Sequence, residues 1–475
     1  MLEKNELAGI LERALKRGGD FAEIYLEKRQ SGNVLCEDNR IERINSGREN
    51  GAGIRVLQDD RTAYVYTNDI SVAGLEQAAD QAARMLNAGL GETASINLTP
   101  RQAACRLEYL RMPDSVALDK KIEWALSANQ AAREIDDEIR QVTVALADMQ
   151  RQLQIANSEG DLVEEEQVRV RAMVNAVAAR DGVIQTGYES VGGAQGWELL
   201  DRTKFETMAR QAAGRAVAML SAQPAPSGKM PVVMHAKAGG TMIHEACGHG
   251  LEADLVQKGM SVFKDKLGQP VAIEKLSVID DATLKGKYGS FAFDDEGTPA
   301  QRTVMIDHGI LTRYLNDRVT ARHDRSELTG NGRRESYQHK PVPRMTNTFI
   351  APGEDDPEAI IAGTDYGLLV KKMGGGQVNT MNGDFVFEVQ EGYIIENGEI
   401  KHPVRGATLT GNGPQVLLDI DMIGRDLGYS LGVCGKEGQG VPVADAQPTL
   451  RIKSLTVGGT GGSGNGQVIK SIRRL

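Results

Sequence analysis

The stretch VTVALADMQRQLQIANSEGDLVEEEQVRVRAMV, residues 142–174, contains two runs in which apolar and polar residues alternate, separated by the turn-forming sequence at 157–160. Because successive side chains of a strand point to opposite faces, each run predicts a β-strand, and the short turn predicts antiparallel pairing. The interleaved polar residues, among them Gln154 and Arg169, predict that one face of this sheet meets water. We expect helices to cover the other face.

Helical periodicity flanks these strands on both sides in the sequence. Apolar residues at helical spacing predict helices over residues 2–15, 72–86, 116–135 and 205–220. Short apolar runs, broken by Gly, Asn and Asp, predict short strands of an antiparallel meander over residues 24–26, 33–36, 54–57 and 63–66. The fold class predicted for residues 1–222 is therefore α+β, an N-terminal antiparallel sheet with packed helices.

The sequence SAQPAPSGK, residues 221–229, interrupts both periodicities with two prolines and a glycine, and it predicts a linker over residues 223–229. Glycine-rich sequence with short strand-like runs follows, which predicts a β-rich C-terminal domain of mixed structure over residues 230–457. The strands are expected at residues 232–235, 302–306, 385–389, 392–395, 415–420 and 449–452. Gly374, Gly375 and Gly376 predict a tight turn or a close backbone approach. The Gly-rich end, residues 458–475, predicts a flexible tail.

Composition restricts the possible partners and the compartment. The formal net charge of -10 and the sequence pI near 5.4 disfavour a broad nucleic-acid-binding surface. The charged N-terminus lacks the apolar core of a signal peptide, and no stretch approaches the ~20 apolar residues that span a bilayer. Four cysteines without short paired spacing disfavour a disulfide framework. We expect a cytoplasmic protein without a membrane partner, whose reduced thiols are available as metal ligands.

The sequence IHEACGHGLEAD, residues 243–254, carries the clearest chemistry in the chain. His244 and His249 are five residues apart, whereas a spacing of four brings two histidines to one face of a helix. Five residues place the second side chain about 140° around the helix from the first. Because an undistorted helix cannot direct both imidazoles at one ion, the spacing predicts either a π-bulge or unwinding at Gly248. A helix start near residues 239–241 would put the motif in its first turns.

A catalytic zinc usually takes three protein ligands and leaves one position open, so two histidines require a third ligand. The candidates from the sequence are Cys247, Cys434, Glu252, Asp254, His235, His339 and His402. Helical spacing favours Cys247, which would share a face with His244. Cys434 lies between Gly432 and Gly435, and the adjacent Lys436 is suited to lowering a thiol pKa. Residue chemistry leaves this choice open. Glu245 has the chemistry of a general base, and the implied reaction is amide hydrolysis.

Five blocks of sequence resemble the TldD/PmbA family, and together they cover most of residues 230–457. The blocks are HEACGHGLEAD (244–254), FDDEGTPAQRT (293–303), TGNGRRESYQHKPVPRMTNTFIAPG (329–353), GDFVFEVQEGYIIENGEI (383–400) and CGKEGQGVPV (434–443). The resemblance implies a zinc metalloprotease in which His244, His249 and Cys434 bind Zn²⁺ and Glu245 is the catalytic acid/base. The family pattern leaves the position of Cys247 free.

The resemblance also implies a partner and a substrate. Members of the family assemble with a TldE/PmbA-like paralogue that lacks the histidine motif, and the heterodimer encloses a chamber that admits unfolded peptide. Because this chain retains the motif, the resemblance implies that it is the active subunit. Two alternatives compete with this prediction. One is a regulatory protein of the DNA gyrase modulator type, whose structural metal site would be closed by Cys247 as a fourth ligand. The other is a metal-dependent hydrolase of small amides.

Overall fold

The computed structural model describes residues 1–59, 61–86, 95–103 and 105–459 of the 475-residue chain. From residue 460 onward the predicted tail lies outside the described residues. Within the described part the architecture is α+β, as the sequence predicts, with an antiparallel sheet in the N-terminal half and mixed sheets in the C-terminal half. No helix in these ranges combines the length and the apolar character needed to cross a membrane.

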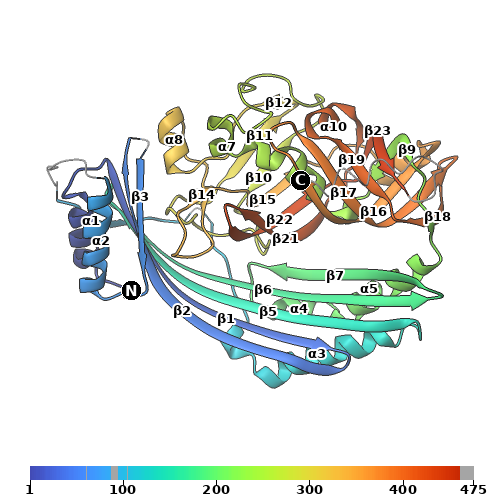
Figure 1. Ribbon diagram of the computed structural model, residues 1–475, viewed down its shortest axis with the longest axis horizontal. Helices are drawn as coiled ribbons and strands as arrows, with labels where there is room; N and C mark the ends of the chain where they lie inside the picture. Colours follow the sequence, from blue (N-terminus) through green and yellow to red (C-terminus); the bar gives the residue numbers. More distant parts are fainter. Residues whose placement is uncertain (60, 87–94, 104, 460–475) are drawn as a thin grey trace.

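The N-terminal half is built on one seven-stranded sheet. Its order is β3-β2-β1-β5-β6-β4, and β7 also pairs with β6. The strands are β1 (Phe21–Glu37), β2 (Arg40–Gln58), β3 (Arg61–Thr67), β4 (Thr99–Pro100), β5 (Ile139–Asn157), β6 (Asp161–Arg180) and β7 (Val183–Gly193). All pairings are antiparallel except that of β4 with β6. The long strands curve, and the C-terminal half lies on their concave side (Figure 1).

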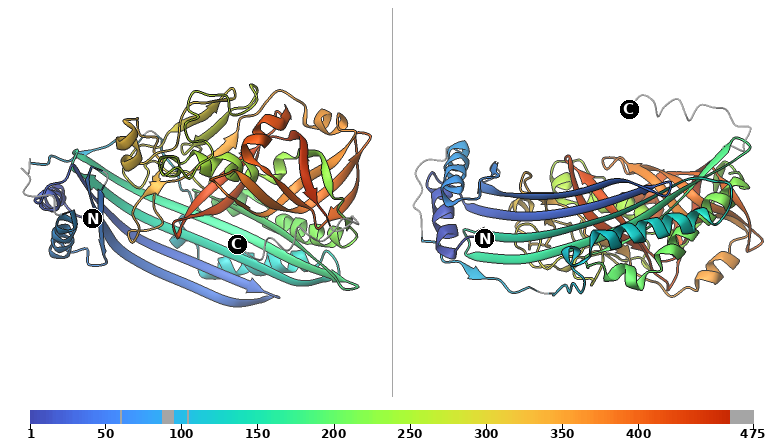
Figure 2. Two further views of the ribbon diagram at one scale, coloured as in Figure 1. Left: turned by 45° about the horizontal axis from the view of Figure 1, so that its top comes forward. Right: turned by 90° about the horizontal axis from the view of Figure 1, so that it is seen from below.

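Helices cover the other side of this sheet in two groups. The helices are α1 (Lys4–Leu15), α2 (Val72–Leu86), η1 (Pro113–Ser115), α3 (Leu118–Arg133), α4 (Glu198–Arg202) and α5 (Phe205–Leu220). α1 and α2 pack on one end of the sheet through a core that includes Ile10, Leu75 and Ile54. α3 and α5 present alanines such as Ala128 and Ala212 to β5, β6 and β7, so they approach the sheet closely. α3 lies along the outer face of the strands (Figure 2).

Two sequence-based expectations for this sheet are wrong. The runs at 24–26 and 33–36 are not separate strands, because β1 continues through both and pairs along its whole length with β2 and β5. The face predicted to meet water is buried where the C-terminal half packs on it. Arg169 is 3% exposed, and its guanidinium donates to the carbonyls of Tyr288 and Ser290. Gln154 lies on the opposite face, toward the helices, where it is 1% exposed and bonds the backbone of Leu2. Local alternation cannot predict that a second domain covers the polar face.

The C-terminal half contains three sheets. A six-stranded sheet has the order β12-β11-β10-β15-β22-β21, an eight-stranded sheet contains β16-β9-β23-β19-β17-β18-β8 with β20 on β23, and β13 pairs with β14. β16 also pairs with β17, which closes five strands into a ring. The strands are β8 (Gln223–Pro224), β9 (Gly228–Met234), β10 (Val278–Asp281), β11 (Arg302–Asp307), β12 (Ile310–Leu311), β13 (Gly332–Arg333), β14 (Val342–Pro343), β15 (Asn347–Ile350), β16 (Tyr366–Val378), β17 (Asp384–Glu396), β18 (Glu399–Arg405), β19 (Thr408–Asn412), β20 (Ile420–Ile423), β21 (Gly428–Lys436), β22 (Gln439–Gln447) and β23 (Leu450–Gly458).

Short helices connect these strands. They are η2 (Ala236–Ala238), α6 (Thr241–Ile243), η3 (His244–Gly248), η4 (His249–Leu251), α7 (Ala253–Gln257), α8 (Arg318–Asp324), α9 (Pro357–Ala362) and α10 (Gly413–Asp419). The strand expected at 415–420 is wrong, because Pro414 in the first turn begins helix α10 instead. Of the two alternatives for Gly374–Gly376, the tight turn is wrong, because the glycines lie in extended β16, where the register with β17 shifts. The close approach is confirmed, since a Cβ on Gly376 would lie 1.8 Å from the Phe387 ring. The two strands expected at 385–389 and 392–395 are one, β17.

Buried ion pairs join the two halves, and we call this group the interdomain charge cluster. The Arg55 guanidinium lies 2.7 Å from Glu23 and 2.5 Å from Glu296, and Arg334 lies 2.5 Å from Glu23. Arg151 lies 2.9 Å from Asp295. Glu23, Arg55 and Arg151 belong to the N-terminal sheet, and their partners across the boundary are Asp295, Glu296 and Arg334. The cluster fixes the concave face of the sheet against the domain that carries the histidine motif. The predicted boundaries at 222 and 229 remain predictions.

Candidate metal centre

The helix that carries the histidine motif is distorted in the predicted way. α6 begins after Gly240, and residues His244–Gly248 continue it as a π-helix in which the backbone N–H of His249 donates to the carbonyl of His244. A π-turn spans five residues rather than four, so both histidines reach one side. Glycine at 248 leaves room for the Met345 side chain, because a Cβ there would lie 2.1 Å from the Met345 sulfur. The π-bulge alternative is therefore confirmed.

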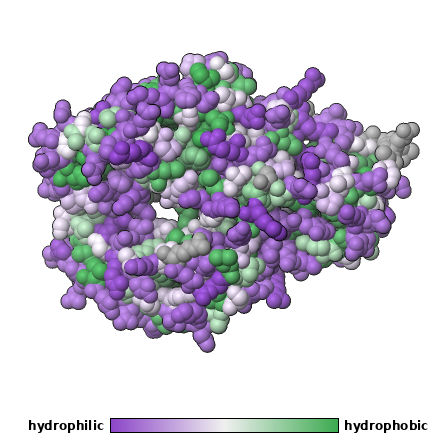
Figure 3. All heavy atoms as spheres, turned by 180° about the vertical axis from the view of Figure 1, so that it is seen from behind, coloured by the Kyte–Doolittle hydropathy of each residue, from purple (hydrophilic) through white to green (hydrophobic). Residues whose placement is uncertain are grey.

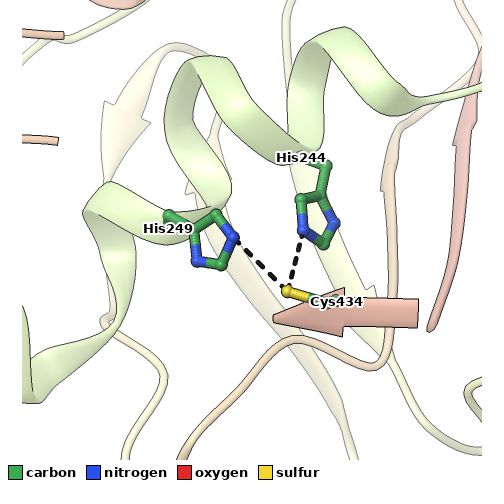
Figure 4. A group of neighbouring side chains, drawn as sticks. All are labelled: His244, His249 and Cys434. Carbon is green, nitrogen blue, oxygen red and sulfur yellow. Dashed lines mark hydrogen bonds between the residues drawn. The ribbon is translucent and has the colours of Figure 1, made fainter. Parts of the chain in front are cut away.

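Three of the predicted side chains converge. The Nε2 atoms of His244 and His249 lie 3.2 Å and 3.3 Å from the Sγ of Cys434, and one ligand atom from each residue lies within 4.8 Å of the others. Figure 4 shows the two imidazoles on the helix directed at the sulfur of Cys434, which lies on strand β21. Within the described residues, this is the group of His, Cys, Asp and Glu side chains whose geometry suits a metal ion.

A carboxylate stands behind each imidazole. The Nδ1 of His244 donates to Asp445 at 2.9 Å, and the Nδ1 of His249 donates to Glu252 at 3.0 Å. These bonds fix the ring orientation and leave each Nε2 as the ligand atom, which is how carboxylates commonly support metal-binding histidines. The sequence analysis missed Asp445. Its available signal was an acid inside the otherwise apolar run VPVADA of β22.

The three converging groups set one another's protonation. Burial lowers the pKa of both imidazoles, but the carboxylates outweigh it, so the pKa of His249 rises to about 9 and that of His244 rises well above its usual value. Burial raises the pKa of the Cys434 thiol, but hydrogen bonds from the two imidazoles lower that pKa to about 5. Cys434 is thus a thiolate at neutral pH, which is the form that binds metals.

The expectation that Lys436 activates this thiol is wrong. Its ammonium lies 3.0 Å from Glu252 and 2.6 Å from Asp254, and it also donates to the carbonyl of Pro343. Because Glu252 holds His249, Lys436 acts on the carboxylate behind the imidazole. Glu252 and Asp254, which the sequence offered as possible ligands, therefore occupy supporting positions.

The other sequence candidates lie outside the converging group. Cys247, which helical spacing favoured, is fully buried in the hydrophobic core, and its thiol points back to the Ile243 carbonyl. The π-turn moves it off the face that the two histidines share. His235 caps η2, and His339 contacts the Ser336 hydroxyl. His402 lies on β18 of the eight-stranded sheet, whereas Cys434 lies on β21 of the six-stranded sheet.

Glu245 points into a large cavity beside the converging groups. The cavity has a volume of about 1510 Å³, and its walls include β7 and α5 of the N-terminal half, β16, and residues 428–436 of β21. His244, His249 and Cys434 lie on the same wall. Burial raises the pKa of the Glu245 carboxyl against the opposing effect of the two imidazoles. The space-filling view shows the molecule hollowed between its two halves (Figure 3).

Known proteins match nearly the whole chain. Models of the PmbA/TldA metallopeptidase family match residues 22–86 (domain 1), 111–220 (central domain) and 227–459 (C-terminal domain). The metalloprotease TldD homolog of Haemophilus influenzae is 35% identical over 469 residues, which cover 97% of each chain. A metalloprotease of Methanocaldococcus jannaschii is 37% identical over 438 residues, covering 91% of this chain and 96% of the relative.

Solved structures share the fold. A Thermotoga maritima protein described as a modulator of DNA gyrase has a TM-score of 0.79 and 24% identity, covering 96% of this chain and 100% of that one. TldE from Thermococcus kodakarensis has a TM-score of 0.75 and 19% identity, covering 95% of this chain and 99% of that one. At these identities the likeness concerns the arrangement of the chain, and the sequence relatives carry the family assignment.

Proposed function

This chain belongs to the PmbA/TldA metallopeptidase family, and from that premise we propose that it is a zinc-dependent protease of unfolded or extended peptides. One observation carries the proposal. His244, His249 and Cys434 direct their ligand atoms at a common point, and Glu245 lies beside that point on the wall of a cavity large enough for a peptide. The experiment that tests it measures zinc content and peptide cleavage together.

The donor set fits zinc. Two imidazole nitrogens and one thiolate are ligands that Zn²⁺ prefers, and three protein ligands leave one position of a tetrahedral site open. The carboxylates of Asp445 and Glu252 hold the rings so that both Nε2 atoms face the thiolate. When bound here, zinc would act as a Lewis acid that polarises the scissile carbonyl and makes a water more acidic.

Glu245 supplies the proton transfers. Its carboxylate accepts a proton from the attacking water and then delivers it to the amine of the leaving peptide. Burial raises its pKa toward the working pH, which suits a group that must both accept and release a proton. Backbone torsions of the π-turn set the direction of this side chain relative to the two imidazoles beside it.

Strand β21 is the proposed binding edge for the substrate. It is the last strand of its sheet, pairs with β22 on one side, and lines the cavity from Gly428 to Lys436. An extended peptide can pair with such an edge through its backbone, with little regard for its side chains. Cys434 belongs to the same strand, so pairing brings the peptide backbone to the proposed metal centre. A folded substrate has no free backbone to offer, and this accounts for a preference for unfolded peptides.

We further propose that the chain works in a heterodimer with a TldE/PmbA-like paralogue. The likeness of its fold to TldE from Thermococcus kodakarensis supports this pairing, because related folds readily form pseudo-symmetric assemblies. The regulatory alternative needs a closed metal site. The inward-pointing Cys247 leaves three candidate ligands in the described part of the chain, which favours the open, catalytic type.

The test uses the full chain, purified with and without its paralogue. Zinc content and cleavage of a disordered peptide are measured for wild type, Glu245→Gln, Cys434→Ala and Cys247→Ala. We expect Glu245→Gln to keep zinc and lose about 10²- to 10⁴-fold in kcat, because only the proton transfers are removed. Cys434→Ala should lose both zinc and turnover. Cys247→Ala is the matched control and should keep both. Equal turnover of wild type and Glu245→Gln would refute the proposed base.

A further inference from the structure

Three lysines in the cavity have no carboxylate within ion-pair distance in the described part of the chain. Lys237, Lys287 and Lys371 line the same cavity as the metal-centre residues. The neighbouring cations are neutralised by two acids: Lys372 lies 3.2 Å from Glu189, and Arg215 lies 2.6 Å from Glu189 and 2.5 Å from Glu391. The wall thus carries unbalanced positive charge, although the chain as a whole has a formal charge of -10. A local field opposite in sign to the protein's net charge attracts anions to that place.

Two of these lysines flank the first residues of strand β21. Lys287 places its ammonium 3.6 Å from the centroid of the Tyr429 ring. Lys237 belongs to η2, which packs against the same end of the strand, since a Cβ on Gly428 would lie 2.1 Å from the Ala236 carbonyl oxygen. Lys287 and the η2 segment that carries Lys237 therefore both lie near the first residues of β21, where a peptide paired with this strand would begin or end.

The third lysine lies next to η2 on strand β16. The backbone N–H of His235, which caps η2, donates to the carbonyl of Val370 at 2.9 Å, and Lys371 follows directly. Burial lowers the pKa of His235, Asp426 opposes this, and Lys237 and Lys371 both lower the pKa further, so both lysines lie near this imidazole. Lys371 also lies 4.7 Å from the centroid of the Tyr393 ring.

The ammonium of Lys287 is partly desolvated, which favours binding of an anion. It is half-buried, and burial alone lowers the pKa of its ammonium, because its ring contact compensates only part of the lost hydration. A carboxylate bound beside Lys287 would compensate for the hydration that its ammonium has lost. Binding energy at such a desolvated cation is larger than at an exposed one, since the local dielectric is lower.

We propose that Lys237, Lys287 and Lys371 form a carboxylate-binding subsite, which we call the lysine subsite, and that the enzyme prefers peptides carrying a carboxylate there. This inference rests on the proposed function. Tyr429 and Cys434 are five residues apart, or roughly 17 Å along a strand. A peptide paired with β21 advances in step with it, so the recognised carboxylate lies about five residues from the scissile bond. It is either an Asp or Glu side chain or the C-terminal carboxylate, because both offer the same chemistry.

The test compares disordered peptides of one sequence that differ in a single carboxylate. One set carries Glu or Gln at each position four to six residues to either side of the cleaved bond. A second set carries Gln throughout and ends in a free acid or an amide at the same distances. For the zinc-loaded enzyme we expect a kcat/KM about tenfold higher for the carboxylate-bearing member of one set, reduced by added salt. Selectivity in the first set identifies a side chain, and selectivity in the second identifies the C-terminus.

Variants and a binding assay keep this inference separate from catalysis. The double variant Lys237→Met/Lys287→Met should bring the ratio near one through KM, whereas Lys275→Met, an exposed lysine outside the cavity, should leave it unchanged. The same labelled peptides are titrated against Glu245→Gln by fluorescence anisotropy, and the carboxylate preference should appear in Kd. Absence of cleavage with a retained Kd preference would refute the proposed protease and support the subsite. Equal kcat/KM and equal Kd across both sets would overturn the lysine subsite.

Discussion

The metal centre and the interdomain charge cluster are both buried, and both join segments that are distant in the sequence, yet their charges are arranged in opposite ways. In the charge cluster, each guanidinium has a carboxylate within 2.9 Å, and the pairs are sealed between the two halves. In the metal centre, the carboxylates stand behind the imidazoles, and the ligand atoms face one another. In the charge cluster, every charge is paired within the protein, whereas the ligand atoms of the metal centre are suited to binding an added cation.

This difference separates what holds the fold together from what prepares the chemistry. Breaking a sealed pair leaves a buried charge without a partner, so the free energy of unfolding should respond. Changing a carboxylate behind an imidazole leaves the fold in place and alters the ligand, so the metal affinity should respond. Four predictions test this difference, given from the largest expected effect to the smallest.

The largest effect is expected from Arg334→Met in the charge cluster. Arg334 is fully buried and pairs with Glu23 across the two halves, so its removal leaves two buried carboxylates, Glu23 and Glu296, to share the single guanidinium of Arg55. We expect a loss of about 3–5 kcal/mol in the free energy of unfolding, measured by urea denaturation. Arg425→Met, which breaks the exposed pair with Asp356, is the control and should change stability by less than about 1 kcal/mol. Equal effects of the two substitutions would contradict the distinction between sealed and exposed pairs.

The pH dependence of zinc affinity comes next. Burial lowers the pKa of His249, but the Glu252 carboxylate raises it to about 9, so below pH 9 a proton must leave before the metal binds. Zinc affinity should therefore fall by about tenfold or more per pH unit from pH 9 down to pH 7. The Cys434 thiol, with its pKa lowered to about 5 despite burial, is already ionised and adds no slope there. Competition with a chelator of known affinity measures this.

The same shift predicts the stability of the metal-free protein. Because the folded pKa of His249 lies above the usual value of 6.5, its contribution to stability is complete below pH 6.5 and is lost as pH rises toward 9. Metal-free protein should lose stability over this range, whereas the zinc-loaded protein should not. Glu252→Gln should flatten both profiles. A zinc affinity that does not change between pH 7 and pH 9 in wild type would contradict the charged state assigned to the histidine.

The smallest of these effects is expected from Asp445→Asn. The variant keeps a hydrogen-bond acceptor near His244 but removes the charge that orients the ring, and zinc affinity should fall by about tenfold. Asp254→Asn is the matched control, since Asp254 binds Lys436 rather than an imidazole, and its effect on affinity should be smaller. A larger loss of affinity in the control would mean that the ammonium of Lys436 is the main support.

The helices were predictable, and so was the distortion at the motif. Periodicity located α2 and α5 to the residue, because each buries one continuous face against the sheet. The five-residue spacing of His244 and His249 required either a π-turn or unwinding at Gly248, and the structure has the π-turn, with the Met345 side chain packed against that glycine. The strand at 415–420 was mispredicted because its apolar residues do not distinguish a short helix from a strand, and the helix start at Pro414 decided the matter.

The α+β class and the two-histidine motif follow from the sequence, because periodicity and spacing are local properties, whereas residue chemistry left the third ligand open among Cys, His and acidic side chains. The packing of distant segments brings Cys434 to the histidines, turns Cys247 into the core and places Asp445 behind His244. It also decided that Arg169 on the polar face of the N-terminal sheet is buried by the second half. These outcomes depend on how segments up to about 200 residues apart pack, and on the local backbone conformation that directs each side chain.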